Sequence, residues 1–250
     1  MRKYSQKFFE TIHDGSSTSA SVILSILRPH AIFNSLLDVG CGAGSWMDAA
    51  RRVLSVSAAN TVGIDGPYSA AMHVGKAGRF VYQDLSEPLD LSGKYDLLVC
   101  VEVGEHLPPM RGASLVNEIC AASDVVVFAA AVPGQGGTGH INEQWPSYWV
   151  EKFWAEGFKV YDPFRPMIWT DPAVAPWYAQ NCFLCVRSDH PIGRSMHASM
   201  ITSRTDWRLS LVHPGVLKLA ACETAGATRL LRALPHTLSN SLKRRLAACS

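Results

Sequence analysis

The chain has 250 residues, of which 48% are hydrophobic, 9% aromatic and 18% charged. This composition is typical of a folded globular protein, and it excludes an intrinsically disordered, collagen-like or coiled-coil chain. No apolar run reaches the roughly 18 to 20 residues that a membrane-spanning helix needs. Because the first residues lack the apolar core of about 7 to 15 residues found in secretory signals, we expect a cytoplasmic protein. The seven scattered cysteines are expected to be reduced thiols, not a disulfide framework.

The net charge of +2 hides an asymmetry along the chain. Residues 191–250 carry nine Lys and Arg against two Asp and Glu, whereas residues 1–190 carry 14 against 19. We therefore predict one domain over 1–190 and a basic, helical extension over 191–250. Leucines at near-helical spacing from Pro214 to Leu234 suit an amphipathic helix. Such a helix either packs on its own domain, which is the commoner case, or makes weak contact with an anionic membrane surface.

Apolar segments that lack period-two alternation recur along the first domain, as expected of parallel strands covered by helices on both faces. The predicted strands are 35–39, 61–65, 79–82, 95–101 and 124–130, followed by a final pair at 158–161 and 181–187. The predicted helices are 20–27, 46–54, 69–77, 109–122 and 145–156. This alternation predicts an α/β fold with a doubly wound, mostly parallel sheet.

A glycine turn follows the first of these strands and opens a helix. Gly40, Gly42 and Gly44 allow positive backbone dihedrals and let a ligand touch the main chain. The dinucleotide fingerprint GxGxxG would need glycine where Ser45 stands, so the pattern is GxGxG. By itself this turn is a weak sign of a cofactor.

Two acidic residues in the right order strengthen the prediction. Asp65 ends the second strand, where a carboxylate can accept hydrogen bonds from both ribose hydroxyls of an adenosine. Asp84 follows the third strand and is placed to bind an adenine amino group. Either acid alone is more often a loop residue or a helix cap. The ordered set indicates a nucleotide-type cofactor.

With these residues the chain resembles the class I S-adenosylmethionine-dependent methyltransferases, over roughly residues 20–190. The matching motifs are Leu37–Gly44, Asp65, Gln83–Leu85 and Cys100–His106. The resemblance implies a Rossmann-like, seven-stranded sheet and S-adenosylmethionine as cofactor. A nicotinamide-dependent Rossmann enzyme is the alternative.

The same resemblance implies a set of cofactor-binding residues. The glycines would face the methionine end of the cofactor, Asp65 the ribose, and Asp84 with Leu85 the adenine. Asp38 would orient the turn and the cofactor ammonium. The full set is Asp38, Gly40, Cys41, Gly42, Gly44, Asp65, Gly66, Asp84, Leu85 and Glu102.

The candidate chemistry lies in the segments that follow the fourth and fifth strands, 102–108 and 133–146, which open onto one crevice in a sheet of this kind. The catalytic candidates are His140, His106 and Glu105. The ExxEH pattern with a later histidine resembles polyprenyl-phenol O-methyltransferases and small-RNA 2′-O-methyltransferases. That resemblance implies Mg²⁺ or another divalent cation held by Glu102, Glu105, His106 and His140, which would activate an acceptor hydroxyl. His106 or His140 as a metal-free general base, and purely structural roles, remain open.

Further segments suit an acceptor pocket. Residues 134–139 are interpreted as a mobile acceptor loop, and Trp145 and Tyr148 suit a sugar or aromatic acceptor, whereas Trp149 is expected in the core. Residues 162–178 form either a hydrophobic hairpin or a flap. The flap would have walls at Trp169, Trp177 and Tyr178 and would offer Arg165 to an anionic group.

The sequence therefore predicts a methyltransferase that acts on oxygen in a sugar or other small hydroxylated metabolite, with glycans and secondary metabolites among the acceptors considered. N-methylation of an amino sugar or small amine is the first alternative. A non-catalytic subunit that binds the cofactor is the alternative outside this class. No nucleic-acid-binding module is recognisable.

Overall fold

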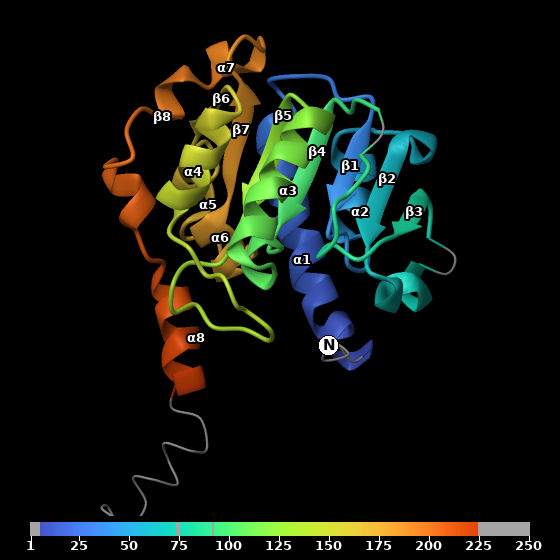
Figure 1. The fold of residues 1–250 in the computed structure, drawn as a ribbon, viewed down its shortest axis with the longest axis horizontal. Helices are drawn as coiled ribbons and strands as arrows, with labels where there is room; N and C mark the ends of the chain where they lie inside the picture. Colours follow the sequence, from blue (N-terminus) through green and yellow to red (C-terminus); the bar gives the residue numbers. More distant parts are fainter. Residues whose placement is uncertain (1–5, 74–75, 92, 225–250) are drawn as a thin grey trace, which may run out of the picture.

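A mixed sheet forms the centre of the molecule, with helices on both faces (Figure 1). The computed structural model describes residues 6–73, 76–91 and 93–224. The strand order is β3-β2-β1-β4-β5-β7-β6-β8. The strands are β1 Leu36–Val39, β2 Thr61–Asp65, β3 Arg79–Tyr82, β4 Leu97–Val101, β5 Val125–Ala129, β6 Phe158–Tyr161, β7 Phe183–Arg187 and β8 Met200–Ile201. Strands β1 to β5 pair in parallel, and β7, β6 and β8 pair antiparallel.

The helices alternate with these strands along the chain. The α-helices are α1 Gln6–Leu27, α2 Ser45–Val53, α3 Pro109–Ala122, α4 Pro146–Ala155, α5 Arg165–Ile168, α6 Pro176–Asn181, α7 Ile192–Ser195 and α8 Pro214–Thr224. The 3-10 helices are η1 Ala58–Asn60, η2 Pro67–His73, η3 Gly104–His106, η4 His197–Ser199 and η5 Trp207–Ser210. Proline at the first helical position of α3 and α4 has a preset φ and needs no hydrogen-bond acceptor there.

The predicted doubly wound sheet is confirmed, and each predicted strand overlaps an observed one. Every residue of β1, β2, β4 and β5 is buried, which explains the missing alternation in the sequence. Side chains of α1, α2 and α6 form one layer of the core, and those of α3 and α4 form the other. Five cysteines are buried free thiols, namely Cys41, Cys100, Cys120, Cys182 and Cys185.

Three features differ from the prediction. The sheet has an eighth strand, because Met200 and Ile201 pair with β6 at the edge of the sheet. The described part of the extension is therefore not entirely helical. The segment predicted as a helix over 69–77 is the 3-10 helix η2, and α1 begins at Gln6 instead of residue 20. Among the described residues, no helix is both long enough and apolar enough to cross a bilayer.

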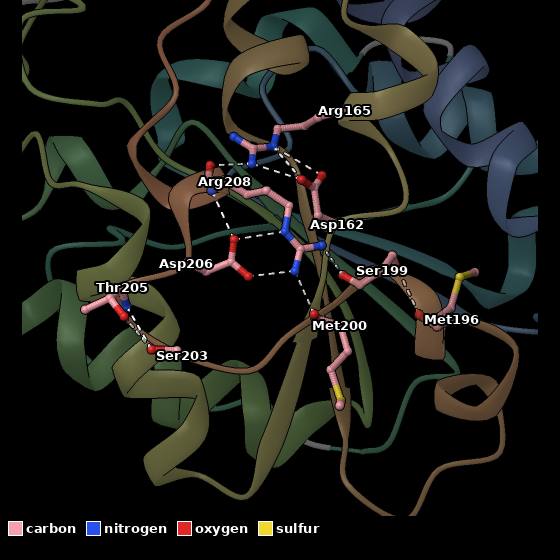
Figure 2. A network of polar contacts seen from close by, with 9 residues as sticks. All are labelled: Asp162, Arg165, Met196, Ser199, Met200, Ser203, Thr205, Asp206 and Arg208. Atoms are coloured by element: carbon pink, nitrogen blue, oxygen red, sulfur yellow. Dashed lines mark hydrogen bonds and ion pairs between the residues drawn. The ribbon is translucent and has the colours of Figure 1, made fainter.

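The described part of the extension is attached to the domain by hydrogen bonds around two ion pairs, one in the domain and one in the extension (Figure 2). Arg165 is only 2% exposed and binds the Asp162 carboxylate through Nε and Nη2, at 2.9–3.1 Å. Its Nη2 also donates to the carbonyl of Arg208 at 2.5 Å. The Arg208 side chain binds Asp206 and donates to the carbonyls of Ser199 and Met200. The expectation that Arg165 is available to an anionic acceptor group is wrong, because its donors are used inside the protein.

Helix α8 ends the described chain. It packs against α6, and the side chain of His213, which precedes it, bonds to the carbonyl of Trp169 at 2.6 Å. The basic residues that follow Thr224 lie outside the described residues, and so do residues 225–234 of the predicted amphipathic helix.

The buried ion pair predicts a large stability effect. Arg165→Ala should lower the free energy of unfolding by about 3–5 kcal/mol, because it leaves the buried Asp162 carboxylate without its cation. Arg204→Ala is the matched control, since Arg204 forms an exposed pair with Glu151 and exposed pairs contribute about 0–1 kcal/mol. Urea denaturation measures both variants. Equal effects of the two substitutions would contradict the assigned role of Arg165.

Candidate active site

The candidate site lies where the carboxyl ends of β1, β2, β4 and β5 meet. β1 lies between β2 and β4, so the chain reverses its direction of winding there. Open α/β sheets bind ligands at this point, outside the carboxyl ends of the strands. The glycine turn, η3 and the segment 133–145 all follow these strand ends.

The glycine turn requires its glycines for two different reasons. Gly40, Gly42 and Gly44 have φ values of 78°, 50° and 79°, which side chains other than glycine rarely adopt. A Cβ on Gly40 would lie 2.2 Å from Cγ2 of Val103. The turn is thus packed directly against the segment that follows β4.

Asp65 is the centre of a hydrogen-bond cluster beside this turn. Its Oδ2 accepts from the backbone N of Gly42 at 2.6 Å. Its Oδ1 accepts from the backbone N of Gly66 at 2.6 Å and from the hydroxyl of Tyr68 at 2.5 Å. The side chain is 4% exposed, and burial raises the pKa of Asp65 despite these three donors.

His73 holds the same turn from the other side. Its Nε2 bonds to the carbonyl of Gly42 at 2.7 Å, and its ring is stacked on Phe80 with 3.7 Å between ring centroids. Burial lowers the pKa of His73. Gly42 is therefore held at its N–H by Asp65 and at its carbonyl by His73.

Asp38 is buried under the turn. Neither of its carboxylate oxygens has a hydrogen-bond partner within the described structure. Burial, with a further contribution from Asp65, raises the pKa of Asp38 well above its ordinary value. A buried carboxylate without donors is unfavourable, so this position suits a cationic ligand group.

Asp84 and Leu85 lie in the loop after β3. The Asp84 Oδ1 accepts from the backbone N and the hydroxyl of Ser86, and these bonds lower the pKa of Asp84. The carbonyl of Leu85 accepts from Nε of the buried Arg111, at 2.9 Å. The other end of the Arg111 guanidinium is paired with Glu118. Arg111 therefore fixes the Leu85 loop to α3.

Glu102 directly follows β4 and has a strained conformation, with φ at 56°. Its carboxylate accepts from Nε2 of Gln135 and Nδ2 of Asn181, both at 3.0 Å. Asn181 Nδ2 also donates to Gln135 Oε1 at 2.9 Å. Strain of this kind persists only where surrounding contacts enforce it, and it is concentrated at functional sites.

Glu105, His106 and His140 form a cluster next to Glu102. One ligand atom from each lies within 4.8 Å of the others, and the two imidazole rings meet edge to face. Glu105 is fully buried, and burial together with Glu102 raises the pKa of Glu105 well above its ordinary value. Burial and the neighbouring His140 lower the pKa of His106 to about 4. The geometric cluster thus includes three of the four residues predicted as metal ligands, and Glu102 is engaged by amide donors.

Glu143 organises the glycine-rich loop that carries His140. Its carboxylate accepts from the backbone N of Gly134 and Gly136, at 2.7 and 2.8 Å. It also accepts from Nδ1 of His140 at 2.9 Å. Gly137 is required here, since a Cβ on it would lie 2.5 Å from Nε2 of His140.

The aromatic residues that were considered for an acceptor pocket differ in how far they are buried. Trp149 is buried as expected, over the backbone of Gly104, whereas Trp145 remains partly exposed. Tyr178 is buried, bonds through its hydroxyl to Ser16 at 2.9 Å and meets the ring of Trp46 edge to face. Helix α6 therefore packs on α1 and α2, which supports the hairpin interpretation of residues 162–178 more than a free flap.

Several residues of the site carry no signal that sequence reasoning used. They are Tyr68, His73, Arg111, Gln135 and Asn181. The partner of Asn181 is 79 positions away along the chain, so no local motif connects them.

Comparisons with known proteins identify the family and the fold of the chain. Residues 12–164, more than half of the chain, match the family model described as a methyltransferase domain. No curated protein matches the sequence. The solved magnesium protoporphyrin IX methyltransferase from Synechocystis, with bound S-adenosylmethionine, has a TM-score of 0.52 at 17% identity, over 75% of this chain and 87% of that one.

Two further solved structures are similar. A sugar N-methyltransferase from Streptoalloteichus has a TM-score of 0.57 at 14% identity, over 75% of this chain and 94% of that one. An S-adenosylmethionine-dependent methyltransferase from Clostridium acetobutylicum has a TM-score of 0.54 at 11% identity, over 72% and 98% of the two chains. At these identities the likeness concerns the fold, and the family model carries the assignment. The chain belongs to the methyltransferase domain family, and its fold is that of class I S-adenosylmethionine-dependent methyltransferases.

Proposed function

We propose that this enzyme transfers the methyl group of S-adenosylmethionine to a hydroxyl oxygen of a small acceptor, a sugar or another hydroxylated metabolite. The observation that carries the proposal is the contact between Nδ1 of His140 and Glu143 at 2.9 Å, beside the cluster at the end of β4. Transfer to an alcohol needs a group that takes its proton, and a carboxylate-oriented histidine is suited to that task.

The residues around the glycine turn fit the cofactor. Asp38 offers a buried carboxylate without a donor to the cofactor ammonium. Gly40, Gly42 and Gly44 leave the backbone accessible to the methionine end, with Cys41 in the same turn. The Asp65 carboxylate, beside Gly66, would accept from the ribose hydroxyls. When bound, the cofactor supplies an electrophilic methyl group on a positively charged sulfur.

The adenine would lie along the loop after β3. Asp84 bonds to Ser86 through Oδ1, and its second oxygen is the one we assign to the adenine amino group. Leu85 lies near the glycine turn, where its Cδ1 would be 3.7 Å from a Cβ on Gly40. Glu102, which directly follows β4, would contribute to the cofactor site from the segment that packs against the turn.

His140 is the proposed general base. With its Nδ1 directed at Glu143, the other ring nitrogen, Nε2, would accept the proton of the acceptor hydroxyl as the oxygen attacks the methyl carbon. Glu143 stabilises the imidazolium that forms. Burial and His140 lower the pKa of His106 to about 4. His106 therefore stays neutral near pH 7 and would orient the acceptor. Glu105 is fully buried, so we assign it a positioning role behind both histidines.

A divalent cation is the second candidate, favoured by the ligand atoms of Glu105, His106 and His140 within 4.8 Å. A carboxylate behind a ligating histidine is common in metal sites, so the Glu143 contact fits this candidate as well. A cation would lower the pKa of the acceptor hydroxyl. N-methylation of a small amine needs neither a cation nor a strong base, and it remains the alternative if alcohols are not substrates.

The ribose assignment predicts a loss of cofactor affinity. Asp65→Asn should weaken the binding of S-adenosylhomocysteine at least about 10-fold, because hydrogen bonds to a charged group contribute about 1.5–3 kcal/mol each. Asp124→Asn is the control, since Asp124 directly precedes β5, at the amino ends of the strands and away from the site, and pairs with Arg187. Calorimetry measures both, and equal affinity of the Asp65 variant and the wild type would refute the assignment.

The base assignment predicts an effect on turnover alone. His140→Ala should lower kcat by about 10²- to 10⁴-fold, the usual contribution of a positioned base, with little change in the dissociation constant of S-adenosylhomocysteine. His30→Ala, an exposed histidine, should have no effect. Equal losses of turnover and affinity would indicate a structural residue. Loss of activity with a chelator, restored by Mg²⁺ or Mn²⁺, would replace the metal-free mechanism with the cation mechanism.

The lowered pKa of His106 predicts a pH dependence of stability. Between pH 6.5 and about 4, the unfolded chain takes up a proton on this histidine that the folded protein does not. The free energy of unfolding that depends on a neutral His106 is therefore fully present above pH 6.5 and is lost as the pH falls through this range. Denaturation of His106→Asn should show a shallower decrease over the same interval. An identical decrease in variant and wild type would contradict the lowered pKa.

A further inference from the structure

The hydroxyl of Tyr68 donates a hydrogen bond to the Asp65 carboxylate, the group that we assign to the cofactor ribose. Asp65 Oδ1 accepts from Tyr68 at 2.5 Å and from the backbone of Gly66, while Oδ2 accepts from the backbone of Gly42. We infer that Tyr68 takes the place of a ribose hydroxyl in the ligand-free enzyme and must leave Asp65 when the cofactor binds. This inference rests on the proposed function of Asp65.

The number of acceptor positions on Asp65 carries the argument. An ionised carboxylate has about four lone-pair positions on its two oxygens. Three of them are used by Gly42, Gly66 and Tyr68, which leaves one. A ribose diol that donates two hydrogen bonds needs two positions, so one existing donor has to leave.

The donors differ in how readily they can leave. The N–H of Gly42 and the N–H of Gly66 belong to the backbone of the glycine turn and of the end of β2, and the carbonyl of Gly42 is also bonded to His73. The Tyr68 donor belongs to a side chain that is 44% exposed, on the second residue of η2, three residues after Asp65. Rotation of an exposed side chain is fast and disturbs no core packing. Tyr68 is therefore the donor that exchanges.

The position of the tyrosine ring agrees with this assignment. A Cβ on Gly66 would lie 2.2 Å from Cε1 and 2.8 Å from Cδ1 of Tyr68. The ring thus lies on the backbone that directly follows Asp65, where the adenosine would have to approach. The absence of a side chain at Gly66 allows Tyr68 to reach Asp65, and the same absence leaves room for the ligand when the ring rotates away.

Tyr68→Phe separates the hydroxyl from the ring. This variant should bind S-adenosylhomocysteine about 2- to 10-fold more tightly than the wild type does. The ratio corresponds to the net free energy of the one hydrogen bond that the wild type has to break before the ligand binds. In steady-state kinetics the KM for S-adenosylmethionine should fall while kcat stays unchanged. Tyr95→Phe is the control, because Tyr95 precedes β4 at the amino ends of the strands, where it forms an isolated β-bridge with Ser123. This substitution should leave the dissociation constant, KM and kcat unaltered.

Ligands without the diol make the test specific for the ribose. Adenosine should bind more tightly to Tyr68→Phe than to the wild type, whereas 2′,3′-dideoxyadenosine should bind both equally. Unchanged or weaker binding of S-adenosylhomocysteine by Tyr68→Phe would overturn the inference and leave the proposed function intact. Failure of the wild-type protein to bind S-adenosylhomocysteine would overturn both. Far-UV circular dichroism and the unfolding midpoint verify that the variant is folded.

Discussion

The close approach between the glycine turn and the segment after β4 is the constraint on which the rest of the site depends. Gly40 is packed so tightly against Val103 that a Cβ would lie 2.2 Å from it. This contact joins two halves of the site that belong to different strands. Asp38, Asp65 and the turn form one half, and Glu102, Glu105 and the histidines form the other. The near-attack geometry that methyl transfer needs follows from holding the two halves at a fixed separation.

Each half contains two kinds of buried carboxylate, those that accept hydrogen bonds and those that have no donor among the described residues. Asp65 and Glu102 receive donors from the backbone or from amide side chains. Asp38 and Glu105 are buried without a hydrogen-bond donor from the described residues, and burial raises the pKa of both. Because burial of an unpaired charge is costly, these two positions mark where a cationic ligand group, a cation or a bound proton lowers the free energy. We therefore propose that these acidic residues serve ligand binding more than the stability of the fold.

The sequence predicted the sheet because the inner strands are buried along their whole length, and that burial requires continuous apolar runs. It also predicted the loops that carry Asp65, Glu102 and His140, since parallel strands bring their carboxyl ends together. Strand β8 has two residues, too short for any periodicity, and its pairing with β6 depends on the tertiary fold. The same holds for the contact of Asn181 with Glu102 and for that of Arg165 with the carbonyl of Arg208, because residues so far apart along the chain form no local pattern. Tyr68 was missed for another reason: an exposed tyrosine three positions after an aspartate is unremarkable until the side chains are placed.

A crystal structure of the protein with S-adenosylhomocysteine bound tests the central claim most directly, because it locates the ligand as well as detecting it. The account predicts the ribose hydroxyls on the carboxylate of Asp65, the ammonium group near Asp38, and the sulfur directed at the space in front of Glu102 and His140. Binding at another edge of the sheet, or a ribose without contact to Asp65, would contradict the account.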